Sequence, residues 1–332
     1  RIGKATSLNG LQWSKITEGS ASEDTFDVTL GLNKESWWGF DTGHVGLGQV
    51  LLPMSLPSVI SEGGVYIMYF MGGNLEELPV SEFMSEVPEN MTDQKVKGMR
   101  MKVGVAISQD GTTFGRIEGD DPSGACMVPY DKSMGPTTGA DGKRIDVDEE
   151  LYCAWPDVVP ITEGPDDFLM YYSTMLKETK EKVIAFGASK EGFRFQKRGV
   201  CLRPDDGTMD AKGLSRCTVQ ENHVYNENGR WTKSKGFTMY YEGVGEDGKH
   251  RVMEAVSTDG KKWTKNGVIL NLGPEGSWDC GGVGSPSVIR MDDGTRRMYY
   301  TGQGADGKTA IGVARQKEDG LWEREQANLT FA

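Results

Sequence analysis

Apolar and aromatic residues form a short block that recurs four times along the chain, at residues 66–70, 168–172, 237–241 and 297–300. Each copy is bounded by Gly or Asp, a pattern typical of a buried strand rather than a helix. A second apolar block follows each copy, at residues 103–108, 183–189, 252–257 and 311–314. This periodic pairing of apolar strands predicts a repeat architecture built from β-structure.

A turn signal follows the second block in every copy. The turn dipeptides are Asp110-Gly111, Glu191-Gly192, Asp259-Gly260 and Asp319-Gly320. An aromatic residue comes soon after each turn: Phe114, Phe195, Trp263 and Trp322. Asp-Gly between apolar strands is a strong hairpin signal, and a further apolar strand precedes each copy. Every copy therefore predicts four antiparallel strands, which is the make-up of a β-propeller blade.

The repeat predicts an all-β, five-bladed β-propeller, with the N-terminal blade incomplete in this chain. We expect one domain over residues 1–332, in which residues 1–30 match the second half of a blade. The four full blades are expected at residues 37–130, 151–207, 214–272 and 277–332. Polar insertions at residues 74–98 and 119–150 are expected to be surface loops or segments that dock onto protein partners.

Composition narrows the classes of partner. The formal net charge of -12 argues against nucleic acid or an anionic membrane, because phosphate binding needs clustered cations. No apolar run reaches the length of a membrane span. The first residue is Arg1, so we expect a processed or trimmed N-terminus, compatible with secretion or with organelle import. The localisation stays open.

The five cysteines (Cys126, Cys153, Cys201, Cys217 and Cys280) are scattered along the chain and have no zinc-finger spacing. Free buried thiols are favoured over a single disulfide. The acidic turns at residues 246–248 and 292–294 lack the ligand spacing of a calcium loop, and no nucleotide-binding fingerprint occurs. We therefore expect no metal and no cofactor.

Two segments carry a resemblance to a known group. Residues 154–158 read Ala-Trp-Pro-Asp-Val and precede the Met-Tyr-Tyr-Ser block at residues 170–173. Residues 219–224 read Val-Gln-Glu-Asn-His-Val and precede Met-Tyr-Tyr at residues 239–241. With the strand pattern, these segments resemble the five-bladed furanosidase superfamily of arabinanases, levansucrases and invertases, and glycoside hydrolase family 43 most closely. The first is similar to that family's Trp-Ala-Pro-Asp strand, and the second to its Glu-Gly-Pro-His strand.

The resemblance implies a pair of catalytic carboxyl groups. Glu221 takes the place of the family's general acid, and Asp157 that of the residue that raises the pKa of the acid and orients the substrate. Glycoside hydrolysis needs a protonated acid at the leaving oxygen and a carboxylate on the other face of the sugar. Neighbouring carboxylates oppose each other's ionisation, which keeps one of them protonated. The alternative is that both residues only complete turns at strand ends.

The resemblance is incomplete at the position of the catalytic base. Alignment of residues 45–50 with residues 283–288 places Gln49 opposite Ser287 and Asp157. An amide cannot accept the proton. Asp41 is the nearest carboxylate and is the candidate base. However, the position of Asp41 recurs as Asp279 in another blade, which favours a structural role.

Further candidates surround these positions. Trp38 and Trp155, together with Trp37, lie at predicted strand entrances, where they would stack on sugar rings or pack between blades. His44 and His223 lie in the same entry motifs and would bind substrate or serve as structural imidazoles. Gln49 joins them as a substrate-binding candidate.

The sequence therefore predicts a glycoside hydrolase-like propeller that acts on or recognises a furanoside or short glycan through an axial acidic pocket. If active, it would hydrolyse O-glycosyl bonds. The alternatives are a catalytically inactive relative that serves as a carbohydrate-binding module, and a scaffold subunit of a larger assembly. Carbohydrate is the expected partner, and proteins could bind through the two insertions.

Overall fold

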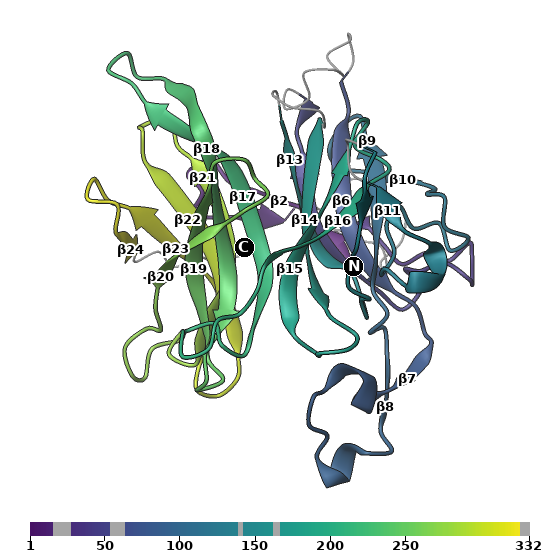
Figure 1. Ribbon diagram of the computed structural model, residues 1–332. Helices are drawn as coiled ribbons and strands as arrows, with labels where there is room; N and C mark the ends of the chain where they lie inside the picture. The colour runs from purple at the N-terminus through teal and green to yellow at the C-terminus, as the bar shows by residue number, and fades with distance from the viewer. Residues whose placement is uncertain (16–27, 54–63, 139–141, 162–166, 326–332) are drawn as a thin grey trace. The chain divides into compact units, whose positions relative to one another are not determined.

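The computed structural model describes residues 1–15, 28–53, 64–138, 142–161 and 167–325. Their regular structure is all-β apart from three short 3₁₀-helices (Figure 1), and the fold is that of a β-propeller. Four antiparallel four-stranded sheets correspond to blades. The all-β propeller fold predicted from the repeat is confirmed.

The first two blades occupy the N-terminal part of the chain. The first comprises β5 (His44–Leu51), β6 (Tyr66–Gly73), β9 (Lys102–Ser108) and β10 (Gly115–Ile117). The second comprises β13 (Ala154–Pro160), β14 (Phe168–Met175), β15 (Lys182–Ser189) and β16 (Gln196–Leu202). In each blade the strands pair in chain order.

The third and fourth blades follow the same order. The third comprises β17 (Gly213–Tyr225), β18 (Trp231–Val244), β19 (His250–Ser257) and β20 (Thr264–Leu270). The fourth comprises β21 (Gly282–Arg290), β22 (Arg296–Gln303), β23 (Thr309–Gln316) and β24 (Trp322–Arg324).

The predicted hairpins join the third and fourth strands of each blade. Their glycines have positive φ angles, for example 68° at Gly111 and 85° at Gly320. This region of the backbone map is open to Gly and strained for other residues. In three blades the N–H of the turn glycine also donates a hydrogen bond of 2.9 Å to a serine hydroxyl. The acceptors are Ser108, Ser189 and Ser257.

The chain forms two compact units. The first contains Arg1–Thr6, Ser14–Lys180 and Ala185–Val200, and the second contains Ser7–Trp13, Glu181–Ile184 and Cys201–Ala332. The first core includes Tyr69 and Tyr172, and the second includes Tyr240 and Tyr300. These aromatic side chains belong to the repeated block, so the block supplies much of each core.

The N-terminal residues form two short strand pairs. One joins β1 (Ile2–Gly3) to β4 (Val28–Leu30), and the other joins β2 (Ala5–Thr6) to β3 (Ser14–Lys15). The extent of the incomplete blade therefore stays a prediction.

The two insertions carry structure of their own. The first holds β7 (Glu77–Pro79), the 3₁₀-helices Val80–Phe83 and Glu89–Met91, and β8 (Lys95–Lys97). Leu78 and Phe83 are buried there and pack in a cluster with Met101, so apolar residues within this polar segment order it. The second insertion holds the 3₁₀-helix Lys132–Met134, β11 (Thr137–Thr138) and β12 (Arg144–Ile145).

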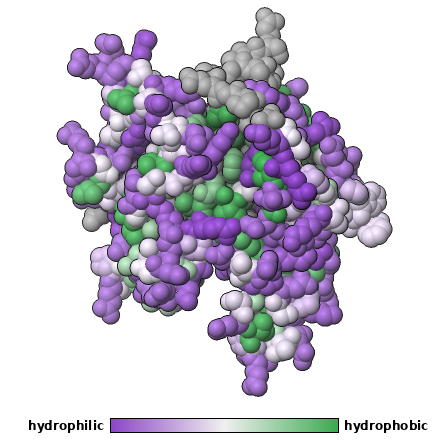
Figure 2. Space-filling model, viewed as in Figure 1, coloured by the Kyte–Doolittle hydropathy of each residue, from purple (hydrophilic) through white to green (hydrophobic). Residues whose placement is uncertain are grey.

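The face of the molecule in Figure 2 is mainly hydrophilic, in keeping with a chain that is 26% charged. Among the residues that the structure describes, no helix has the length and apolar character that crossing a membrane requires.

The first strands of the two blades in the first unit lie against each other. Gly48 of β5 faces Pro156 of β13 so closely that a Cβ at Gly48 would lie 2.2 Å from the carbonyl oxygen of Pro156. Only Gly permits this approach. The contact fixes how the start of β13 meets β5.

Gly48→Ala is therefore expected to lower the free energy of unfolding by about 1–3 kcal/mol, because overpacking at this contact must push the two strands apart. Gly115→Ala is the matched control, since a Cβ at Gly115 meets nothing within 4 Å. Chemical denaturation of both variants measures the difference. Equal stability of the two variants would contradict the packing of β5 on β13.

Candidate functional site

Asp157 occupies an inner-strand position that recurs in each blade. It pairs with Tyr171 across β13 and β14, and Gln49 pairs with Tyr69 across β5 and β6. Tyr171 and Tyr69 hold the same place in the repeated block, so Asp157 and Gln49 are equivalent, as the sequence alignment placed them. The Asp157 side chain is buried, with 5% of the residue exposed.

Gln49 is held by the neighbouring strand. Its Oε1 accepts a hydrogen bond from the backbone N–H of Val158, at 2.6 Å, one residue beyond Asp157. The amide therefore joins β5 to β13 beside Asp157. Because an amide oxygen is a weak base, Gln49 can position a ligand or a strand but cannot take a proton in catalysis.

Trp155 precedes Asp157 in an unusual backbone conformation. Its φ angle is 49°, and a β-bulge separates Ala154 from Asp157 in the pairing with β14. A bulky residue at positive φ is strained and persists only where its surroundings impose the conformation. The Trp155 ring is partly buried against the cluster that contains Met71 and Tyr152.

The second unit places different residues at the position of Asp157. Thr218 pairs with Tyr240, and Ser287 pairs with Tyr299. Glu221 instead pairs with Phe237, three residues farther along β17 than Thr218. Glu221 therefore does not share the register position of Asp157 in its own blade.

Glu221 and His223 line a polar cavity of about 290 Å³ together with Glu254 and Arg296. Lys233 Nζ lies 2.7 Å from Glu221 Oε1, and 16% of the Glu221 side chain is exposed. Arg290 donates a hydrogen bond of 2.9 Å to Nδ1 of His223. The structure thus brings these two predicted residues to one cavity, in which cations engage both side chains.

Asp41 is buried, with 1% of the residue exposed, and forms an ion pair of 2.6 Å with Nε of Arg116. The same guanidinium donates a hydrogen bond to the carbonyl of Gly31. Asp41 and Trp38 line a cavity of about 900 Å³ in the first unit. Asp41 is one of four similar carboxylates.

Every blade has a buried carboxylate that pairs with a cation of the fourth strand. The pairs and their N–O distances are Asp41–Arg116 (2.6 Å), Glu150–Lys197 (2.5 Å), Asp210–Lys265 (2.7 Å) and Asp279–Arg324 (2.7 Å). Each carboxylate lies four residues before a buried residue of the first strand, and each cation lies two residues after the aromatic that follows the hairpin turn. The pairs join the two edges of each blade.

A tyrosine of the second strand completes three of these pairs. Tyr172, Tyr241 and Tyr300 donate hydrogen bonds to the carboxylates of Glu150, Asp210 and Asp279. The first blade has Phe70 at this place. Consequently, among the described residues, Oδ1 of Asp41 is a buried oxygen with no hydrogen-bond partner.

The sequence contains a signal for these cations that the predicted motifs did not include. An aromatic residue is followed two positions later by Arg or Lys in every blade: Phe114 and Arg116, Phe195 and Lys197, Trp263 and Lys265, Trp322 and Arg324. Only the aromatics entered the prediction. The sequence also shows that the position of Asp41 recurs as Asp279, and the structure places both in equivalent pairs.

The Asp279 pair predicts a loss of stability in acid. Burial by itself would raise the pKa of Asp279, but the hydrogen bonds from Arg324, Ser277 and Tyr300 and the charge of Arg324 together lower it below the ordinary value of 3.8. The unfolded chain therefore binds this proton at higher pH than the folded chain. The stabilisation that the ionised Asp279 contributes is complete above pH 3.8. It is lost as the pH falls through the pKa that Asp279 has in the folded protein.

We expect the free energy of unfolding to fall less steeply below pH 3.8 in Asp279→Asn than in the wild type. Urea unfolding at a series of acidic pH values measures the slopes. Glu275→Gln, at an exposed position, is the control and should follow the wild type. A wild-type slope in Asp279→Asn would contradict the role of this carboxylate.

His44 and the exposed tryptophans complete the predicted set. Nε2 of His44 donates a hydrogen bond of 2.8 Å to the carbonyl of Gly98, at the end of the first insertion, which gives His44 a structural contact. Trp37 and Trp38 are 86% and 55% exposed and meet edge to face, with ring centroids 5.9 Å apart. Their rings are accessible for stacking on a ligand.

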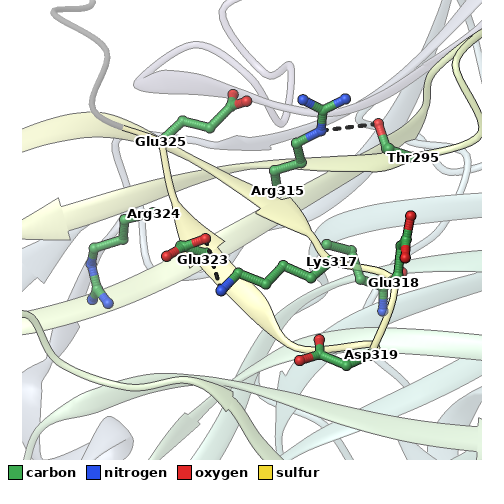
Figure 3. A pocket seen from close by; sticks show the side chains of 9 residues that line it. Thr295, Arg315, Lys317, Glu318, Asp319, Glu323, Arg324 and Glu325 are labelled. Carbon is green, nitrogen blue, oxygen red and sulfur yellow. Dashed lines mark hydrogen bonds and ion pairs between the residues drawn. The ribbon is translucent and has the colours of Figure 1, made fainter.

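A further depression lies on the outer strands of the fourth blade and has a volume of about 700 Å³ (Figure 3). Charged residues of both signs line it. Lys317 pairs with Glu323 at 3.0 Å, and Arg315 donates a hydrogen bond to Thr295. Because these side chains form ion pairs and hydrogen bonds with one another, they leave fewer polar groups for a ligand than the cavities that Asp41 and Glu221 line.

The five cysteines are free. Burial raises the pKa of the Cys126 thiol to about 11 and that of Cys153 to about 12, which disfavours the reactive thiolate form. Among the described residues, no group of three His, Cys, Asp or Glu side chains is arranged to hold a metal ion.

The fold defines a class: an all-β propeller, the fold that this chain shares with solved structures described as glycoside hydrolases. A solved structure of a BT0996 RGII complex matches 98% of this chain and 80% of its own, with 17% identity and a TM-score of 0.59. A second solved structure, described as a glycoside hydrolase, matches 99% of this chain and 80% of its own, with 16% identity and a TM-score of 0.59.

A third similar structure is Zg3597, a family 117 glycoside hydrolase from the marine bacterium Zobellia galactanivorans. It matches 89% of this chain and 74% of its own, with 15% identity and a TM-score of 0.52. No protein-family model and no curated protein matches the chain. At these identities the likeness concerns the fold, and one fold serves many functions.

Proposed function

We propose that the protein recognises a furanoside or short glycan at β5 and β13, the first strands of its first two blades, and lacks two-carboxylate hydrolysis. The observation that carries the proposal is that buried Asp157 and Gln49 hold equivalent positions of β13 and β5, which the hydrogen bond from Val158 N–H to Gln49 joins beside Asp157. A carboxylate beside an amide provides acceptors and donors for sugar hydroxyls. It does not provide the second carboxylate that hydrolysis needs.

Aromatic residues support the carbohydrate part of the proposal. Trp155 lies two residues before Asp157, and its strained backbone indicates a position set by more than local preference. Trp38 lies on the rim of the cavity that Asp41 lines, with an exposed ring. Flat aromatic faces suit the apolar faces of sugar rings. The resemblance to glycoside hydrolase family 43 and the fold of the similar structures point to the same class of ligand.

A second candidate is a glycoside hydrolase in which Glu221 is the acid, Asp157 its modulator and Asp41 the base. The observation that favours it is Oδ1 of Asp41, which has no hydrogen-bond partner among the described residues. The ion pair of Asp41 with Arg116 repeats a contact found in all four blades and favours a structural role instead. We therefore rank recognition above hydrolysis.

Product analysis by mass separates the two candidates. The protein is incubated at length with arabino-, xylo-, galacto- and fructo-oligosaccharides, beside Glu221→Gln as control. The proposal predicts that every oligosaccharide keeps its mass. Cleavage by the wild type and not by Glu221→Gln would overturn the proposal and establish the hydrolase, with Asp41→Asn as the next variant to measure.

A further inference from the structure

A buried carboxylate holds a histidine in the third blade. Glu242 lies on β18, and His250 is the first residue of β19. Nδ1 of His250 lies 2.7 Å from Oε1 of Glu242. The Glu242 side chain is only 10% exposed, whereas the imidazole of His250 is 47% exposed. One edge of the ring is therefore fixed and the other faces solvent.

The second oxygen of Glu242 is also engaged. The backbone N–H of Ser285 donates a hydrogen bond of 2.7 Å to Oε2. Burial by itself would raise the pKa of Glu242, but the hydrogen bond and charge of His250, the charge of Arg216 and the Ser285 N–H lower it overall. Glu242 is therefore a carboxylate at neutral pH and accepts the proton of the imidazole N–H.

This contact selects one form of the neutral imidazole. Because a carboxylate can only accept, Nδ1 of His250 carries the proton, and Nε2 is left with a lone pair. Among the residues that the structure describes, no hydrogen bond to Nε2 is found. Nε2 is thus a hydrogen-bond acceptor with an accessible position.

Polar groups surround the Glu242 carboxylate, and a cavity is lined by the chain neighbours of His250 and Gly282. Arg216 donates a hydrogen bond to the hydroxyl of Ser285, whose backbone has a positive φ of 51°. A Cβ at Gly282 would lie 3.7 Å from Cβ of His250, so the start of β21 runs close to the histidine. A cavity of about 680 Å³ adjoins these elements and is lined in part by Lys249, Gly281 and Gln303.

The repeated fold does not require this pair. The equivalents of Glu242 in the other blades, each one residue after the last aromatic of the repeated block, are Met71, Ser173 and Thr301. The strands that correspond to β19 begin at Lys102, Lys182 and Thr309. Among the described blades the carboxylate–imidazole pair occurs in one of four, so the repeated architecture does not require it.

We infer that His250 binds a hydroxyl group of a neutral glycan through Nε2, with Glu242 as the residue that positions the ring. The backbone N–H of Ser285 and the charge of Arg216 act on Glu242 and help to keep it ionised and in place. This inference rests on the proposed function and gives the second unit a glycan contact of its own.

The test uses titration calorimetry with neutral arabino-, xylo-, galacto- and fructo-oligosaccharides as probes. His250→Ala and Glu242→Gln are expected to raise the Kd of the oligosaccharide that the wild type binds by about tenfold, because each removes or misdirects one hydrogen bond to the ligand. Glu246→Gln, an exposed glutamate in the turn between β18 and β19, should bind like the wild type. His250→Ala changes a half-exposed side chain and should keep the fold.

Nitrogen NMR of the imidazole gives a readout that a structural role would not move. In the neutral imidazole of the wild type the Nε2 resonance should shift on addition of the ligand, whereas Glu242→Gln should lose the single tautomer. Wild-type affinity in His250→Ala, or an Nε2 resonance that ligand does not shift, would overturn the inference and leave the proposed function standing. If the wild type binds none of the oligosaccharides, both the inference about His250 and the proposed function are contradicted.

Discussion

Glu150→Gln is expected to lower the free energy of unfolding by about 3–5 kcal/mol, because removal of one partner leaves a buried charge without compensation. Only 7% of Lys197 is exposed, and its Nζ lies 2.5 Å from Oε2 of Glu150. Burial by itself would lower the pKa of Lys197, but Cys153 and Glu150 raise it overall, so the ammonium stays charged. Chemical denaturation monitored by circular dichroism measures the loss.

Two variants separate this effect from a general sensitivity of the segment. Glu149→Gln alters the neighbouring residue, which pairs with the exposed side chains of Lys132 and Lys177, and should be far milder. The double variant Glu150→Gln/Lys197→Met removes both charges and should be more stable than Glu150→Gln alone. A double variant less stable than the single one would contradict the account of the pair.

The second large effect is expected at Asp157. Asp157→Asn keeps the size of the side chain and removes its charge, and a hydrogen bond to a charged group contributes about 1.5–3 kcal/mol. The Kd for the bound oligosaccharide should therefore rise by roughly ten- to a hundredfold. Titration calorimetry of the wild type and the variant measures the change.

Asp93→Asn, at an exposed position of the first insertion, is the control and should bind like the wild type. The thermal unfolding of Asp157→Asn must be followed in parallel, because Asp157 is buried. A variant that folds and binds with unchanged affinity would show that Asp157 is not part of the site.

The strands were predictable because each blade repeats one apolar pattern. The aromatic blocks became β6, β14, β18 and β22, and the Asp-Gly and Glu-Gly turns became the hairpins before the fourth strands. Burial of alternating aromatics and the φ angle of a turn glycine are local properties, and local properties can be read from a sequence. The equivalence of Gln49 and Asp157 also followed from the strand pattern.

The site was harder to predict because a sequence motif does not show which residues lie opposite each other on paired strands. The Glu221 segment resembles a catalytic strand, yet Thr218 holds the position of Asp157 in that blade, and Glu221 lies three residues farther along β17. The Glu242–His250 pair joins two strands through a buried side chain, and nothing in the spacing of the two residues marks it. Order within the first polar insertion came from Leu78 and Phe83, two isolated apolar residues.

Glycan recognition is the central claim, and calorimetric titration of the wild-type protein with neutral arabino-, xylo-, galacto- and fructo-oligosaccharides tests it most directly. We predict saturable binding of at least one of them, with the ligand recovered at its original mass. Absence of binding to every oligosaccharide would contradict the claim.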